Sequence, residues 1–161
     1  MQVAIVIKPD DTIETVEYKG YDTLHDAVDG FIEHIKDVPI PGVGTASFYC
    51  NEEFLLKDEV GPANAIASGI YGDIVFGNVV VDMLLPGGDS KGFDYVAENG
   101  ELQVCEAYVV LDVLKRFVEK NKDVLAEVHQ AYDNVKPDIK MRFYKAGDTG
   151  VVEVDTDYGD R

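Results

Sequence analysis

The chain has 161 residues, 46% of them hydrophobic and 10% aromatic, which is enough to bury the core of one domain without disulfide bridges. Its 31 acidic residues against 14 basic residues give a formal net charge of −17, and this charge repels nucleic acids and anionic lipids. No stretch approaches the roughly 20 apolar residues of a membrane span, and the first residues lack the features of a signal peptide. We therefore expect a single cytoplasmic domain over 1–161 that binds neither nucleic acid nor membranes directly.

The negative charge is concentrated in the first 100 residues, which hold 18 acids, five lysines and no arginine. Such a surface attracts basic partners. Acidity also serves solubility alone, and composition does not separate these two explanations.

The N-terminal part of the sequence predicts a strand pair followed by a helix. Apolar residues at 3–7 and a β-rich stretch at 13–18, separated by Pro9 and two aspartates, predict a β-hairpin. A helical spacing of apolar residues then predicts an amphipathic helix over 23–36, with its buried side formed by Leu24, Val28, Phe31, Ile32 and Ile35.

Further strands are expected in the middle of the chain. The segments 46–50 and 54–56 flank a polar turn. The segment 73–85 is the most apolar in the chain and rich in β-branched residues, which predicts a central strand buried on both faces. Asn99–Gly100 lies between two β-rich stretches and is typical of a two-residue hairpin turn.

The last third of the sequence predicts helix and then a final hairpin. Apolar residues at helical spacing run over 106–135, as one long helix or as two helices broken near Asn121. The stretches 139–144 and 151–154 predict the hairpin, which an acidic tail follows. The expected fold class is therefore α+β: a mixed β-sheet packed with an N-terminal amphipathic helix and a long C-terminal helical region.

Acidic residues recur at intervals of three and four along the predicted helix and just beyond it, at Asp22, Asp26, Asp29, Glu33 and Asp37. On one helix these residues form a line of negative charge, although like charges at this spacing destabilise the helix slightly. The line suggests a nucleic-acid mimic or a docking strip for a basic protein. The alternative is an ordinary solvated face opposite the apolar side chains.

The turn after the predicted strand 46–50 offers a second group of candidate residues, Asn51, Glu52 and Glu53. Carboxylates are ligands for hard cations, but neighbouring residues of a strand point to opposite faces and share an ion only if the chain turns. A polar hairpin tip is the simpler interpretation. Cys50, with His25 or His34 as its imidazole partner, is a weak candidate for catalysis because such a cysteine is usually a small buried hydrophobe.

The motif Cys50–Asn51–Glu52–Glu53, together with Gly72–Val81, resembles an uncharacterised domain family found mainly in phages and mobile elements. Its members have a strand pair, a helix, a CNEEG-like turn and a strand of the form GDI-x-x-G-x-x-x-V. The resemblance covers about the first 85 residues and makes 86–161 a helical and hairpin extension. This chain departs from the pattern at Phe54, where the family has glycine, and at Ala63–Asn64–Ala65, where an Asn–Arg pair is usual. Because the family has no established activity, the resemblance implies a phage-like origin rather than a reaction.

Three functions remain open from the sequence. The leading hypothesis is a non-enzymatic acidic binding protein that engages a basic surface of a host protein, through the five helix acids and the turn residues named above. The first alternative is a small metal-dependent hydrolase built on Glu52 and Glu53, and the second is a self-associating structural protein with 106–135 as its dimer seam. We assign no catalytic or metal-binding residue and expect no cofactor.

Overall fold

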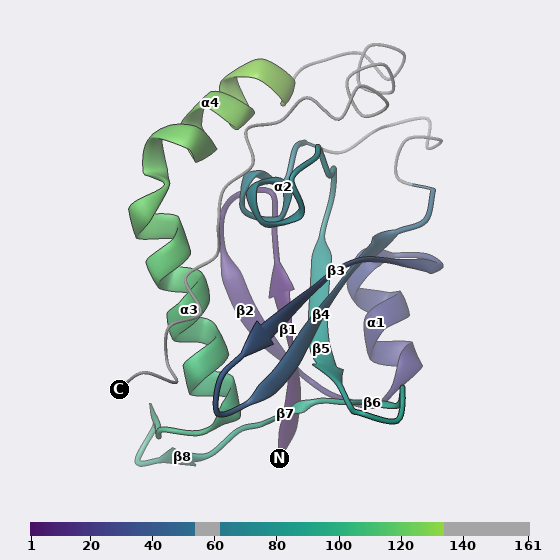
Figure 1. Cartoon of the computed structure of the whole chain (residues 1–161), viewed down its shortest axis with the longest axis vertical. Coiled ribbons are helices and arrows are strands. Elements are labelled where there is room, and N and C mark those ends of the chain that lie inside the picture. The colour runs from purple at the N-terminus through teal and green to yellow at the C-terminus, as the bar shows by residue number, and fades with distance from the viewer. Residues whose placement is uncertain (54–61, 134–161) are drawn as a thin grey trace.

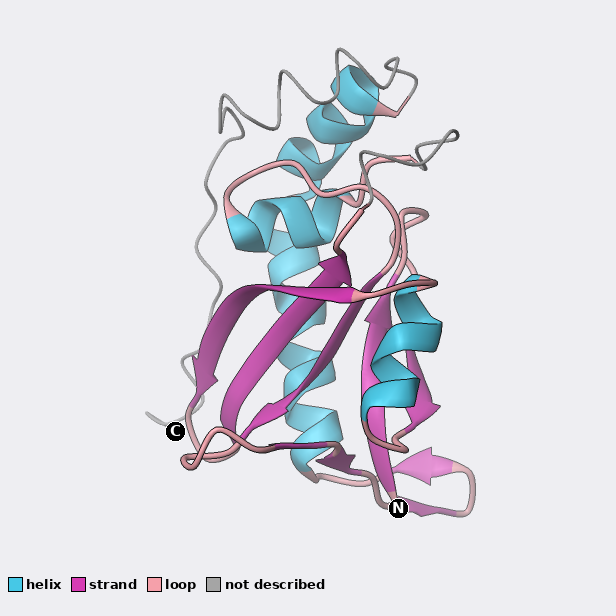
Figure 2. Ribbon diagram, turned by 90° about the vertical axis from the view of Figure 1, so that its right-hand side faces the viewer, coloured by secondary structure: helices cyan, strands magenta, loops and turns pink. Residues whose placement is uncertain are grey.

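A five-stranded antiparallel path forms the centre of the fold in the computed structural model, which describes residues 1–53 and 62–133. The strands of this path are β1 (Gln2–Ile7), β2 (Ile13–Glu17), β3 (Ile32–Ile40), β4 (Gly44–Asn51) and β5 (Val79–Leu84). The helices are α1 (Tyr21–Val28), α2 (Ala65–Tyr71), α3 (Glu106–Lys120) and α4 (Lys122–Tyr132). Helix α1 lies on one face of the sheet, and α3 lies on the other (Figures 1 and 2).

The strand order is β2-β1-β5-β4-β3, and two short strands lie off this path: β6 (Ser90–Lys91) pairs with β5, and β7 (Phe93–Asp94) pairs with β1. The expected α+β class is confirmed. All pairings between the described strands are antiparallel, whereas a mixed sheet was expected. A separate hairpin of β8 (Ala97–Glu98) and β9 (Glu101–Leu102) turns at Asn99 and Gly100, both with positive φ, as the sequence predicted.

The apolar segment near residue 80 occupies the middle of the sheet, as predicted, but its strand is shorter than expected. Val79, Val80 and Val81 are fully buried because both faces of β5 are covered. The residues before them, 73–78, are not a strand. Gly77 has a φ of +82°, a conformation that favours glycine and turns the chain before β5 begins.

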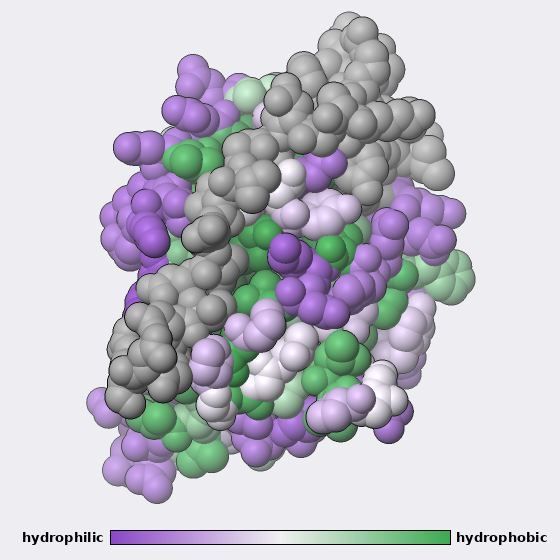
Figure 3. Space-filling view, viewed as in Figure 1, coloured by the Kyte–Doolittle hydropathy of each residue, from purple (hydrophilic) through white to green (hydrophobic). Residues whose placement is uncertain are grey.

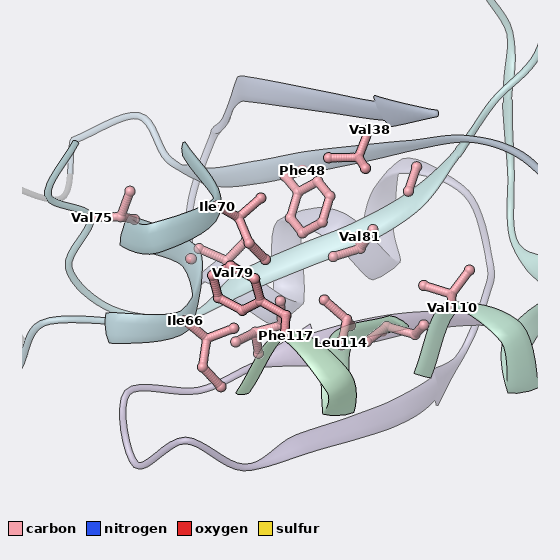
Figure 4. Close-up of a cluster of buried hydrophobic side chains, with 14 of the residues drawn as sticks. Val38, Phe48, Ile66, Ile70, Val75, Val79, Val81, Val110, Leu114 and Phe117 are labelled. Carbon is pink, nitrogen blue, oxygen red and sulfur yellow. The ribbon is translucent and has the colours of Figure 1, made fainter. Parts of the chain in front are cut away.

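Successive residues of the strands point to opposite faces and form two separate cores. The main core lies between the sheet and helices α2, α3 and α4, and Figure 4 shows Phe48, Val81 and Phe117 within it. The smaller core lies under α1, where Leu24 and Val28 pack against three sheet residues, Ala4, Val6 and Val80.

The predicted helix over 23–36 is wrong in its second half, because α1 ends at Val28. Asp29 adopts a left-handed conformation with φ 57°, and Gly30 follows with φ 158°. Asn51 supports the turn by donating from Nδ2 to the carbonyl oxygens of Val28 and Asp29, at 3.0 Å each. The chain then enters β3, and Phe31 is 65% exposed rather than buried.

The C-terminal helical region consists of two helices that break at Asn121, one of the two alternatives expected. Asn121 has non-helical dihedral angles, and its Nδ2 donates to the carbonyl oxygen of Phe117 at 2.8 Å. No helix in 1–53 or 62–133 is long and apolar enough to cross a membrane. The strands predicted at 54–56, 139–144 and 151–154 lie outside the described residues.

Candidate functional site

The five acidic residues predicted as one line of charge lie on two elements and the turn between them. Asp22 and Asp26 are on α1, Asp29 ends that helix, and Glu33 and Asp37 are on β3. All five are exposed, as expected. The predicted single line is wrong, because β3 is a strand and its side chains alternate between two faces.

The register of β3 places its two acids on opposite faces of the sheet. Glu33 pairs with Cys50, whose side chain belongs to the main core, whereas Asp37 pairs with Ser47 on the α1 face. Only Asp22 and Asp26 therefore share a helix surface.

A groove of about 440 Å³ lies between α1 and the β1–β2 hairpin. Its apolar lining comes from Val6, Val16 and Ala27. Thr23 and Asn78 add polar groups to the lining. Four carboxylates and two lysines complete it, namely Glu14, Glu17, Asp22, Asp26, Lys8 and Lys19. The groove is thus concave, apolar in part and negative in net charge.

The two lysines of the groove pair with acids of the hairpin. Lys8 Nζ lies 3.0 Å from a carboxylate oxygen of Glu14, and Lys19 Nζ lies 3.9 Å from one of Glu17. The acids of α1 are therefore the main source of the net negative charge. The carboxylate of Asp26 also lies 3.6 Å from the imidazole of His25, and its side chain is 83% exposed.

The turn residues Asn51, Glu52 and Glu53 divide into one buried and two exposed side chains. Asn51 is only 6% exposed. Its amide group binds the end of α1 as described above, and its Oδ1 accepts from the backbone N–H of Glu53 at 2.7 Å. The side chain of Asn51 thus positions the turn, which corrects its predicted role in direct partner contact, while Glu52 and Glu53 remain available at the surface.

Replacing Gly30 by alanine is expected to destabilise this turn. An added Cβ would lie 2.4 Å from Nδ2 of Asn51, so the amide must move and lose its two bonds to α1. We expect the free energy of unfolding in urea to fall by about 1–3 kcal/mol. Gly87→Ala is the control, because an added Cβ there meets nothing within 4 Å. Equal effects of the two substitutions would contradict the role assigned to Asn51.

The metal-dependent hydrolase gains no support from the residues that the structure describes. Within 1–53 and 62–133, no group of three histidine, cysteine, aspartate or glutamate side chains could hold a metal ion. Burial raises the pKa of the Cys50 thiol to about 12. Cys50 belongs to the main core, whereas His34 packs its ring against Tyr49 on the α1 face. The proposed thiol–imidazole pair with His34 is therefore not formed.

The outer surface of the C-terminal helices does not favour the dimer seam either. Figure 3 shows mostly hydrophilic residues along the upper left edge of the molecule, where α4 and the adjoining end of α3 lie. Among the large hydrophobic residues of these two helices, Tyr108 alone is exposed, at 39%. An obligate seam requires a contiguous apolar surface.

Sequence reasoning missed a polar cluster beneath the α1 face of the sheet. Asp82 of β5 is 0% exposed and accepts a hydrogen bond at Oδ2 from the hydroxyl of Tyr18 at 3.0 Å. Its Oδ1 has no hydrogen-bond partner among the residues that the structure describes. Burial raises the pKa of Asp82 to about 6. Asp82 lies within an apolar run, so no local pattern could have identified it.

A histidine, an aspartate and a serine lie beside Asp82, but their order does not suit nucleophilic catalysis. The hydroxyl of Ser47 donates to Oδ1 of Asp37 at 2.5 Å, and Nε2 of His34 lies 2.7 Å from the same oxygen. Burial opposes ionisation of Asp37, but these two hydrogen bonds outweigh it and lower its pKa. In a catalytic triad the imidazole lies between the other two groups. Here the carboxylate of Asp37 lies between the serine and the imidazole, so the imidazole does not contact the serine, and the lowered pKa makes the carboxylate a weak base.

Comparison with known proteins finds no matching family model, no matching curated protein and no matching solved structure.

Proposed function

We propose that this protein is a non-enzymatic acidic binding protein, which holds a basic segment of a partner protein in the groove between α1 and the β1–β2 hairpin. The observation that carries the proposal is the groove itself, in which carboxylates of Asp22 and Asp26 border an apolar lining. Lysine and arginine side chains combine an apolar stem with a charged head. They therefore match both parts of the groove.

The nature of the partner is part of the same proposal. The CNEE turn resembles a domain family of phages and mobile elements, which supports a basic host protein, encountered in the host cytoplasm, as the target. A defence or DNA-handling protein has the required basic surface. The division of the acids between α1 and β3 favours recognition of a basic segment over imitation of a straight line of phosphates.

The test measures binding of a deca-lysine peptide to the wild-type protein and to the double variant Asp22→Lys with Asp26→Lys. Binding is expected to weaken at least about tenfold in the variant at low salt, and to weaken steeply for the wild type between 50 and 300 mM salt, because exposed charges are screened. The variant should still fold, since both residues are exposed. The two lysines repel each other as the two aspartates do, and the loss of the acidic residue from the first turn of α1 costs only about 0.3–1 kcal/mol.

Glu98→Lys with Glu101→Lys is the matched control, because it changes the net charge equally on the exposed β8–β9 hairpin. If both double variants bind the peptide equally well, the attraction is a general effect of net charge and the groove is not the site. Glu52→Gln tests the alternative that the protein is a hydrolase. That alternative predicts that the variant loses hydrolytic turnover but still binds the peptide.

A further inference from the structure

Three aromatic rings form an exposed cluster on the side of α1 away from the groove, which we call the α1 aromatic cluster. It consists of Tyr21, His25 and Phe31. The ring centroids of Tyr21 and His25 lie 6.0 Å apart, and those of His25 and Phe31 lie 6.0 Å apart in an edge-to-face arrangement. Tyr21 is 49% exposed and Phe31 is 65% exposed.

The structure holds Phe31 at the surface through specific contacts. The left-handed residue Asp29 reverses the chain after α1, and Asn51 binds the carbonyl oxygens of this turn. The carbonyl oxygen of Phe31 accepts from the backbone N–H of Glu52 at 2.8 Å. An apolar ring fixed in solvent in this way marks a contact surface more than a packing defect.

A crest of negative charge, formed by Asp22 and Asp26, separates the α1 aromatic cluster from the groove. Tyr21 and His25 are one turn apart on one side of α1, while Thr23 and Ala27 line the groove on the other. Asp22 and Asp26 lie between them and are exposed. Asp29 and Glu52 are exposed next to Phe31 in the turn. The rings are therefore bordered by carboxylates.

This combination identifies the chemistry of a ligand. The face of an aromatic ring attracts cations, and neighbouring carboxylates strengthen the attraction. A planar guanidinium can stack on a ring and bind a carboxylate through two parallel hydrogen bonds at once. A lysine ammonium is a compact, strongly hydrated charge and does not stack.

We propose that the α1 aromatic cluster binds an arginine side chain of the basic partner, with its guanidinium against Phe31 and paired with a carboxylate of the crest. This inference rests on the proposed function and adds to it a preference for arginine over lysine. The partner segment then crosses the crest, with further basic residues in the groove.

The test compares deca-arginine with deca-lysine, two peptides of equal charge, by calorimetric titration at 150 mM salt. The wild-type protein is expected to bind deca-arginine about tenfold more tightly, and Phe31→Leu should reduce this ratio to about twofold or less, because leucine keeps apolar area but has no ring. Binding of deca-lysine should change little in this variant. Tyr108→Leu removes an exposed ring from α3 and should leave the ratio unchanged. Thermal melting verifies that each variant is folded.

The outcomes separate this inference from the proposed function. If Phe31→Leu leaves the ratio at its wild-type value while the double lysine variant of α1 weakens both peptides, the arginine site is wrong and the acidic groove stands. If the double lysine variant binds both peptides as well as the wild type does, the proposed function fails. Backbone amide shifts at 29–31 and 52 on addition of deca-arginine, beside the shifts expected along the groove, would support the inference, and shifts that leave 29–31 and 52 unchanged would overturn it.

Discussion

Replacement of Phe117 by alanine is expected to lower the free energy of unfolding by about 3–5 kcal/mol, the usual cost of removing a buried aromatic ring. Phe117 is 0% exposed and lies in α3. A Cβ added to Gly69 of α2 would lie 3.0 Å from its ring and 3.9 Å from Leu125 of α4. The ring thus reaches the point where α2 and α4 approach α3. Its loss leaves a cavity that three helices border, which they can close only by moving together.

Urea unfolding followed by circular dichroism measures this change. The control is Tyr108→Ala on the same helix, where partial exposure predicts a loss below about 1 kcal/mol. Equal midpoints for the two variants would show that the helices do not depend on Phe117 for their packing. A changed slope with urea would instead indicate a less cooperative transition.

Asp82 is expected to make the protein less stable as pH rises from 4 to 7. Burial raises the pKa of this carboxyl group to about 6 from its ordinary value of 3.8, so the folded state binds more protons than the unfolded state between these values. The free energy of unfolding therefore falls through this window, and the cost at neutral pH is about 3 kcal/mol. The titratable groups around Asp82 are Tyr18, Tyr49, His34 and Asp37.

Asp82→Asn removes this titration. Relative to the wild type, the variant should gain about 2–3 kcal/mol in the free energy of unfolding between pH 4 and pH 7. Asp37→Asn should show a change of the opposite sign at lower pH, because the pKa of Asp37 is lowered from 3.8. Its ionised form contributes stability that is almost fully present at neutral pH and is lost mainly as the pH falls below about 4. Urea unfolding at several pH values measures both differences. If the difference in the free energy of unfolding between Asp82→Asn and the wild type does not vary with pH, the raised pKa of the buried Asp82 carboxyl is contradicted.

The hairpins and the central strand could be predicted from sequence because their signals are local. Asn99–Gly100 specifies a tight turn by the conformations that these two residues tolerate. The apolar run at 79–81 specifies a strand covered on both faces. In each case the residues that determine the structure lie within a few positions of one another.

The error at 23–36 has a physical cause in the packing of β3. Ile32 contacts the small core under α1, whereas Ile35 packs against the main core on the other face of the sheet. A strand that contributes to two cores can carry apolar residues three positions apart, which imitates the spacing of a helix. The left-handed turn at Asp29, which ends α1, depends on Asn51, a residue 22 positions later.

The candidate site was predictable only in part for the same reason. Exposure of Asp22 and Asp26 follows from the apolar residues opposite them on α1. The groove requires the β1–β2 hairpin beside that helix, and the α1 aromatic cluster requires the reversal that turns Phe31 outward. The bond between Tyr18 and Asp82 joins residues 64 positions apart. No short sequence pattern specifies contacts between residues that lie so far apart in the chain.

The strand order also has a consequence for how the chain folds as it is synthesised. The hairpins β1–β2 and β3–β4 form from neighbouring residues, but no pairing joins them directly. Strand β5 lies between them, with Val81 opposite Ile5 on one side and Phe48 on the other. Both hairpins leave the ribosome before β5 and keep an unpaired inner edge until it arrives. The five-stranded path is completed by insertion of its middle strand, so its closure is a long-range step that makes folding slower than local pairing alone would allow.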